Sequence, residues 1–280
     1  MTAPAPAVFG AYDQAALDLQ FNNRARCPDF ATYIARYPQS SARVRAEIGG
    51  ELDLAYGTGP RDKLDLFRPK AAGSGKPPVL VFIHGGYWQQ LDKSYFSYLA
   101  RSWTRSGAAF VALGYPICPG VTMEQLVSSV RAGIAWVASE AGALGLDGRR
   151  IAVAGHSAGG HLTAMATTGP GPDLVGGVAL SGLYDLEPIR LSYLNAALRM
   201  GPEEARRLSP IHLPRPRGGH LILAVGSAES EEYHRQQDTL AATWDVEARS
   251  LAGLHHFSIV DTLADRANPL FQTVAELLRL

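Results

Sequence analysis

Residues 151–167 read IAVAGHSAGGHLTAMAT and combine an apolar run, a glycine-rich turn and a segment with helical spacing. The run Ile151–Ala154 is typical of a buried strand, and the pattern predicts a helix over Ala158–Thr167. Between them, GHSAG at 155–159 matches G-x-S-x-G, the turn that exposes a nucleophilic serine. Small neighbours allow Ser157 strained backbone angles, and the helix start favours negative charge there. An ordinary glycine-rich turn is the alternative.

The same alternation of apolar runs and helical patterns extends along most of the chain. Apolar runs typical of strands covered on both faces occur at 79–83, 108–113, 151–154, 175–180, 221–225 and 246–251. Helical spacing follows at 95–106, 123–143, 158–167, 231–243 and 268–278. Such alternation predicts an α/β protein with right-handed crossovers, a mostly parallel central sheet and helices on both faces. No linker interrupts it, so we expect one domain over 1–280.

Two segments depart from this alternation. Residues 12–46 have helical spacing that is broken near Asn22 and again near Pro28. Short alternating patterns at 52–56 and 64–67 follow, as expected of an antiparallel pair of strands. Residues 186–214 are helical in pattern and contain no strand, so we expect a small helical cap over the strand ends.

A second glycine motif, HGGYW at residues 84–88, directly follows the strand predicted at 79–83. Successive glycines let backbone N–H groups turn toward an oxyanion without a Cβ in the way, and H-G-G in this place matches a known oxyanion loop. We predict that the amides of Gly85, Gly86 and Ala158 stabilise an oxyanion. The alternative is a turn that needs glycine only for its conformation, but the order of the two motifs favours the oxyanion loop.

A serine is a poor nucleophile until a base removes its proton, so a histidine and an orienting acid are expected. With this type of elbow the chain order is serine, acid, histidine. The histidine should follow the run at 246–251, where His255 and His256 are neighbours. Spacing alone does not choose between them.

The acid should follow the run at 221–225. Glu229 comes first in that loop, whereas Glu231 and Glu232 are expected to begin the next helix, where acids complement the helix dipole. Asp185, after the preceding strand, is the rival, and its other interpretation is a cap for the helical excursion. We predict Glu229.

The remaining histidines have simpler interpretations. His161 is expected to be packed and hydrogen-bonded, His156 to fill the elbow, and His84 to order the oxyanion loop. Histidines and carboxylates show no metal-ligand spacing such as H-E-x-x-H, so we expect neither a metal nor another cofactor.

Composition favours a small-molecule substrate by exclusion. Basic and acidic side chains number 26 each in 280 residues, so no basic field indicates nucleic acid or an anionic membrane. No apolar stretch is long enough for a membrane span, and residues 1–10 lack the pattern of a signal peptide. Cys27 and Cys118 form neither a disulfide framework nor a metal motif, so we expect a cytoplasmic protein. A homodimer is compatible with the sequence.

Several stretches resemble kynurenine formamidases (arylformamidases) of the α/β-hydrolase superfamily. They are NNRA at 22–25, HGGYW at 84–88, HL at 161–162, SGLYDLEP at 181–188, LSP at 208–210 and EYHRQ at 232–236. The resemblance spans nearly the whole chain and implies the α/β-hydrolase fold and hydrolysis of N-formyl-kynurenine to kynurenine and formate. It also implies Ser157 as nucleophile, His256, which precedes a phenylalanine as in relatives, as base, and Glu229 as acid, where the family commonly has aspartate.

The resemblance leaves open what the site acts on. Tyr87 and Trp88 lie beside the oxyanion loop and either contact an aromatic leaving group or belong to the core. A carboxylesterase for small acyl esters is the alternative activity. A non-catalytic binding protein of the same fold is a further alternative, which the complete set Ser157, Glu229 and His256 disfavours.

Overall fold

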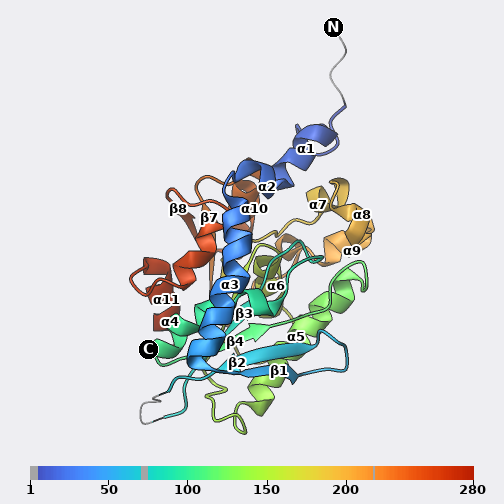
Figure 1. The fold of residues 1–280 in the computed structure, drawn as a ribbon. Coiled ribbons are helices and arrows are strands. Elements are labelled where there is room, and N and C mark those ends of the chain that lie inside the picture. The colour runs from blue at the N-terminus through green and yellow to red at the C-terminus, as the bar shows by residue number, and fades with distance from the viewer. Residues whose placement is uncertain (1–5, 71–74, 217) are drawn as a thin grey trace.

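One eight-stranded sheet organises the computed structural model, which describes residues 6–70, 75–216 and 218–280 (Figure 1). The first five residues, part of the stretch considered for a signal peptide, lie outside this description. The strand order is β1-β2-β4-β3-β5-β6-β7-β8. The strands are β1 (Glu51–Ala55), β2 (Lys63–Phe67), β3 (Val79–Ile83), β4 (Ala109–Leu113), β5 (Ile151–His156), β6 (Gly176–Leu180), β7 (His220–Gly226) and β8 (Glu247–Leu251).

The six expected apolar runs all form strands, with bounds shifted by two residues at most, and they are parallel to one another. Only β2 runs the other way: it pairs antiparallel with β1 on one side and with β4 on the other. The predicted mostly parallel sheet with an antiparallel pair is therefore confirmed. Because parallel strands end at one edge, the loops that follow them meet on the same side.

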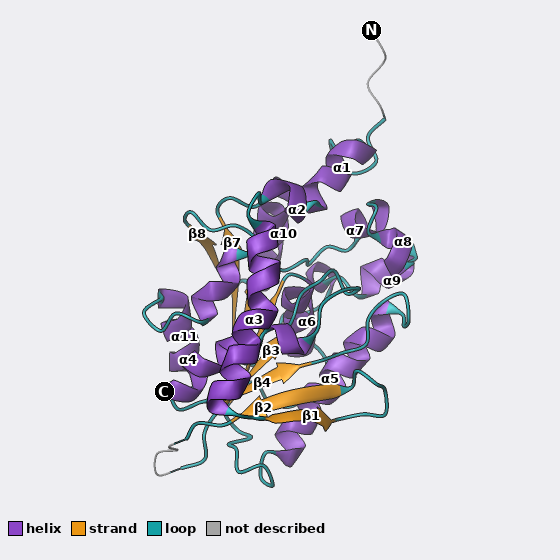
Figure 2. Ribbon diagram, in the orientation of Figure 1, coloured by secondary structure: helices purple, strands orange, loops and turns teal. Residues whose placement is uncertain are grey.

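Helices cover both faces of the sheet, as expected (Figure 2). The α-helices are α1 (Gln14–Phe21), α2 (Asn23–Arg26), α3 (Phe30–Ile48), α4 (Ala100–Arg105), α5 (Met123–Glu140), α6 (Ala158–Thr167), α7 (Glu187–Leu191), α8 (Asn195–Leu198), α9 (Pro202–Arg207), α10 (Glu231–Trp244) and α11 (Pro269–Leu277). Short 3-10 helices lie at Lys93–Tyr95, Ser97–Leu99, Pro210–His212 and Ser258–Leu263.

The central strand β3 shows why both faces must be covered. Its five residues are all buried: Val79, Val81 and Ile83 pack in a core with α5 and α6. Leu80 and Phe82 point the other way, into a core shared with α3, α4 and α11. Successive side chains of a strand point to opposite faces, so a continuous apolar run requires a helical layer on each.

The N-terminal segment forms three helices instead of the two expected, because the chain is interrupted twice. Asn22 ends α1 and caps α2, where its side chain accepts a hydrogen bond from the Ala25 amide. A turn at Cys27 and Pro28 then separates α2 from α3. Helices α1 and α2 lie near the carboxyl ends of the parallel strands, on the same side as the expected cap segment 186–214, which forms α7, α8 and α9 (Figure 1).

His161 of α6 joins the loop after β3 to the cap segment. The Trp88 indole donates to His161 Nδ1 at 3.2 Å, and His161 Nε2 donates to the Leu208 carbonyl at 2.8 Å. The ring is fully buried, as expected of a packed and hydrogen-bonded histidine. Burial lowers the pKa of His161 to about 4, because the charged ring would lose its hydration. Burial likewise lowers the pKa of His84 to about 4.

These neutral histidines predict a loss of stability in mild acid. A histidine in the unfolded chain has a pKa near 6.5. Between pH 6.5 and 4 the unfolded chain therefore binds protons, while the buried rings of the folded protein stay neutral. The free energy of unfolding should therefore be constant above this range and fall by about 2 kcal/mol per buried histidine by pH 5. His161→Gln, which retains a donor and an acceptor, should make the slope shallower in denaturant titrations from pH 7 to 4.5. An unchanged slope would contradict this role for His161.

Candidate active site

Ser157 lies in a turn so crowded that only glycine fits on both sides. The serine links β5 to α6 with φ 58° and ψ −118°, and its side chain is buried near the strand ends. A Cβ on Gly155 would lie 2.1 Å from the Gly159 carbonyl oxygen, and one on Gly159 would lie 2.0 Å from that of Ile83. No side chain tolerates such contacts, so the two glycines of the motif are required by packing.

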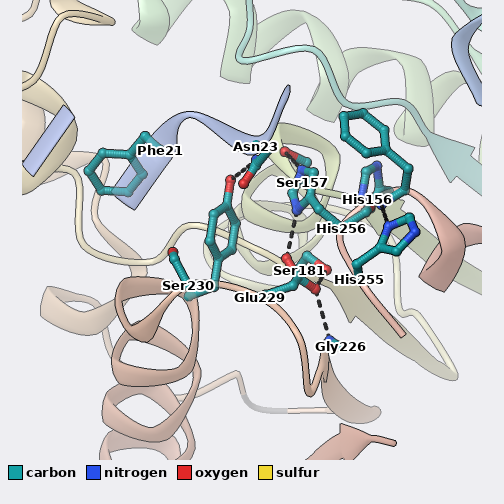
Figure 3. Close-up of polar contacts among 12 residues, drawn as sticks. Phe21, Asn23, His156, Ser157, Ser181, Gly226, Glu229, Ser230, His255 and His256 are labelled. Atoms are coloured by element: carbon teal, nitrogen blue, oxygen red, sulfur yellow. Dashed lines mark hydrogen bonds and ion pairs between the residues drawn. The ribbon is translucent and has the colours of Figure 1, made fainter. Parts of the chain in front are cut away.

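Ser157, His256 and Glu229 form one hydrogen-bonded row (Figure 3). His256 Nε2 lies 3.0 Å from Ser157 Oγ, and His256 Nδ1 lies 2.7 Å from Glu229 Oε2. Since the carboxylate accepts from Nδ1–H, the unprotonated Nε2 faces the serine hydroxyl. All three side chains are largely buried. The arrangement can move a proton from the serine to the histidine while the carboxylate holds the ring.

Two further donors fix the Glu229 carboxylate. Ser181 Oγ donates to Glu229 Oε1 at 2.6 Å, and the Gly226 amide donates to the same oxygen at 2.8 Å. Ser181 itself has φ 48°, and its amide donates to the Ala224 carbonyl in the neighbouring strand β7. Sequence reasoning did not assign Ser181 a role. Its only signal was its place directly after β6, within a motif quoted for the resemblance.

The rival residues are engaged elsewhere. Asp185 Oδ1 accepts from the Glu187 amide at the start of α7, and Oδ2 pairs with Arg235 at 2.9 Å, so this carboxylate is bound away from His256. His255 Nε2 faces Asp29 at 3.3 Å, and its Nδ1 accepts backbone amides from the turn that follows. Of the adjacent histidines, the structure brings His256 to the serine.

His156, the variable position of the elbow, holds the backbone of His256. Its Nε2 donates to the His256 carbonyl at 2.7 Å, and the two ring centroids are 4.6 Å apart. Burial, reinforced by the charge that His256 would carry, places the pKa of His156 well below its usual value. The ring therefore acts as a neutral donor that fixes the histidine loop to the elbow.

The predicted oxyanion loop lies directly against the elbow. A Cβ on Gly85 would be 2.8 Å from the His156 carbonyl oxygen and 3.1 Å from Ser157 Cβ. Gly86 has φ 111°, where a Cβ would lie 2.2 Å from the Gln90 carbonyl oxygen. In the described part of the chain, the amides of Gly85, Gly86 and Ala158 donate to no protein acceptor. Three amide donors are thus available in and beside the elbow.

The buried His84 side chain contacts this loop and stabilises its conformation. Its Nδ1 donates to the Gly85 carbonyl at 2.7 Å, and its ring stacks on Tyr115 with centroids 4.2 Å apart. The Tyr115 hydroxyl in turn donates to the His84 carbonyl at 2.7 Å. These contacts agree with the expectation that His84 orders the loop.

Of the two interpretations of Trp88, the one in which it contacts the substrate is wrong. Gly86, Tyr87 and Trp88 all have positive φ, and this tight turn directs the Trp88 side chain into the core, where it is fully buried and bonded to His161. Tyr87 instead lines the cavity that contains Ser157. The core alternative therefore applies to Trp88, and the substrate contact stays a prediction for Tyr87.

A second polar network, which sequence reasoning missed, lies beside the serine. Asn23 Nδ2 lies 2.9 Å from the hydroxyls of both Tyr87 and Tyr233, which are 2.8 Å from each other. Tyr87 donates to the Phe21 carbonyl at 2.7 Å. Burial raises the pKa of Tyr233, and its hydrogen bonds with Tyr87 and Asn23 partly counteract this. The only sequence signal for Asn23 was its membership of the NNRA stretch.

Ser157 and His256 open into a cavity of about 920 Å³. Its walls come from the oxyanion loop, from α1 and α2, and from the cap around α8. Aromatic rings contribute much of the surface: Phe21, Tyr37, Tyr87, Tyr95, Phe96, Tyr193 and Phe257. A cavity of this size and character suits a small, partly aromatic molecule.

Across residues 6–70, 75–216 and 218–280, histidine, cysteine and carboxylate side chains do not gather into a group that could hold a metal ion. Every helix in these ranges is too short or too polar to cross a lipid bilayer.

Known proteins share this architecture. A family model described as BD-FAE matches residues 64–174. Kynurenine formamidase of Danio rerio is 30% identical over 249 residues, which cover 83% of each chain. Kynurenine formamidase of Salmo salar is 28% identical over 277 residues, covering 92% of each. The crystal structure of a candidate thioesterase from Silicibacter sp. TM1040 superposes with a TM-score of 0.83 and 30% identity, covering 92% of this chain and 98% of that one.

The two carboxylates that competed for the acid position should differ sharply on substitution. Glu229→Gln should lower kcat for an activated ester by roughly 10³–10⁴-fold, because the histidine loses its orienting charge and preferred tautomer. Asp185→Asn, the matched control, should change kcat far less, because this carboxylate does not contact His256. Steady-state rates with both variants at equal thermal stability test the assignment, and the reverse ranking would move the acid to Asp185.

Proposed function

Because this chain belongs to the kynurenine formamidase family of α/β-hydrolases, we propose that it hydrolyses an aryl formamide, N-formyl-kynurenine, to kynurenine and formate. The observation that carries the proposal is the hydrogen-bonded row Ser157–His256–Glu229 at the base of an aromatic-lined cavity. With this substrate the enzyme would act in tryptophan catabolism.

In the proposed mechanism, each of these residues acts at a defined step. Ser157 Oγ attacks the formyl carbon while His256 Nε2 takes its proton, and Glu229 stabilises the imidazolium that forms. The amides of Gly85, Gly86 and Ala158 receive the developing oxyanion. His256 then protonates the arylamine nitrogen, and kynurenine leaves. Water, deprotonated by His256, next attacks the formyl-serine, and formate is released as the serine takes its proton back.

The chemistry of an aryl formamide suits this site. A formyl group has only hydrogen beyond its carbonyl, so the acyl side of the site needs little room. The leaving nitrogen shares its lone pair with the ring, which makes this amide easier to cleave than an alkyl amide. On the leaving-group side, Tyr87 and Phe257 line the cavity next to the serine and histidine and offer faces for an aromatic ring.

The cavity also presents opposite charges for the amino-acid end of the substrate. Arg24 and Asp18 both line it. Arg24 Nη2 donates to the Gln90 side chain at 2.8 Å, and Asp18 Oδ1 accepts from the Tyr193 amide at 2.8 Å, so both charges are positioned by neutral partners. We assign the substrate carboxylate to Arg24 and its ammonium to Asp18, because a guanidinium matches the planar carboxylate fork.

Hydrolysis of small esters or thioesters is the second candidate. The same nucleophile, base and oxyanion donors would cleave an ester, and the chain is 30% identical to the candidate thioesterase described above. The two activities differ in the leaving group, which is an alcohol or thiol for an ester and an amine for a formamide.

The acyl and leaving groups decide between them. Wild-type enzyme should show a higher kcat/KM for N-formyl-kynurenine than for its N-acetyl analogue, beyond the ratio of their uncatalysed rates, since a methyl group in a tight pocket changes binding by about 1–3 kcal/mol. Ser157→Ala should lower kcat by roughly 10⁶-fold and prevent labelling by a fluorophosphonate. Fast turnover of short alkyl esters without measurable deformylation would favour the esterase.

The charged groups should affect only a substrate that has an amino-acid end. Arg24→Gln should raise KM for N-formyl-kynurenine about tenfold relative to KM for formanilide, which has the same scissile bond but no carboxylate. Parallel kinetics on the two substrates measure this ratio. Equal changes in both KM values would remove Arg24 from carboxylate recognition.

A further inference from the structure

The amide of Asn23 has a fixed orientation beside the nucleophile. The Tyr87 hydroxyl donates its single hydrogen to the Phe21 carbonyl, so its oxygen can only accept from Asn23 and Tyr233. Between the two phenols Tyr233 must therefore be the donor, and its oxygen accepts from Asn23. The atom of Asn23 that faces both phenols must therefore be the donor Nδ2. Its carbonyl oxygen, Oδ1, is directed away from the two phenols.

Asn23 Oδ1 is available to a molecule in the cavity. The residue lines the same cavity as Ser157 and His256, with 5% of its surface exposed, and Figure 3 shows it next to the serine. No donor among the described residues reaches Oδ1, and this oxygen is not sealed in the protein interior. The start of α2 holds the residue in place: the Asn22 side chain caps the helix, and the Asn23 carbonyl of the main chain accepts from Cys27.

An acceptor here distinguishes an amide from an ester. When the serine adds to an anilide, the nitrogen becomes pyramidal and its lone pair must face His256 Nε2 to receive the proton. The N–H of the same nitrogen then points elsewhere and needs an acceptor. An ester oxygen has no hydrogen, so a hydrogen bond to this group lowers the barrier for amides alone.

We propose that Asn23 Oδ1 accepts the N–H of the scissile amide in the transition state, and that Asn23 is thereby a specificity-determining residue for formamides over esters. The inference rests on the proposed function, because it concerns the leaving nitrogen of that reaction. Tyr87 and Tyr233 act through Asn23 by holding its amide in the required orientation.

The test compares substrates that differ at one atom. Formanilide and phenyl formate share the formyl group and the ring but leave as an amine and a phenol. In Asn23→Leu, kcat/KM for formanilide should fall relative to that for phenyl formate by about tenfold or more, the effect of losing one transition-state hydrogen bond. Tyr87→Phe removes one of the two phenol oxygens that orient the Asn23 amide but keeps the Asn23 carbonyl, so it should lower the same ratio in the same direction but by less.

A second measurement requires no variant. N-Methylformanilide lacks the N–H, so the wild-type enzyme should disfavour it against formanilide by more than the ratio of their hydroxide-catalysed rates. If Asn23→Leu fails to fold, Asn23→Ala and this substrate comparison decide the question.

The outcomes separate this inference from the proposed function. An amide-to-ester ratio that is the same in wild type and in a folded Asn23 variant overturns the role of Asn23 and leaves the formamidase proposal intact. A wild-type enzyme that cleaves phenyl formate but neither formanilide nor N-formyl-kynurenine overturns the proposed function, and the inference falls with it. A selective loss of amide hydrolysis in the Asn23 variant, together with discrimination against N-methylformanilide, supports both.

Discussion

The close backbone contact between β3, β5 and α6 is the constraint on which the site depends. At Gly155 and Gly159 there is no space for a Cβ, and between them the chain turns at Ser157 with a positive φ. The same contact brings the loop after β3 against the elbow, where a Cβ on Gly85 would lie 3.1 Å from Ser157 Cβ. The nucleophile and the proposed oxyanion donors are therefore positioned by one packing requirement. A single side chain at either glycine would displace all of them together.

The other proposed catalytic groups depend on the parallel sheet. The loops after β6, β7 and β8 leave the same edge as the elbow, and they supply Ser181, Glu229 and His256 in that order. The Glu229 carboxylate is held in place because the Gly226 amide and the Ser181 hydroxyl both donate to its Oε1, which leaves Oε2 for the histidine. Glu229 thus reaches His256 at 2.7 Å, and its side chain is restrained by these two donors.

The sequence predicted what depends on local pattern and failed where contacts are distant. Apolar runs gave every strand of the parallel region, and the elbow was recognisable because glycine spacing reports its crowding directly. Trp88 was left with two interpretations because a motif beside the site does not report which way its side chains turn, and here three positive φ angles decide it. The choice between His255 and His256 could not be made from spacing, since neighbours in a loop follow no periodicity. Asn23 meets Tyr233 across 210 residues, a contact that no local pattern encodes.

The groups proposed for the chemistry and those proposed for recognition come from different parts of the chain. The sheet and its loops hold Ser157, His256 and Glu229, whereas α1 and α2 supply Asp18, Asn23 and Arg24 to the cavity wall. The two parts are joined at Tyr87, which belongs to the loop after β3 but donates its proton to Phe21 at the end of α1. Buried polar groups are costly when a partner is missing, so this junction fixes the N-terminal helices in one position over the serine. A change within α1 or α2 can therefore alter which leaving group is accepted while the distances among serine, histidine and glutamate remain unchanged, because no hydrogen bond of that row involves these helices.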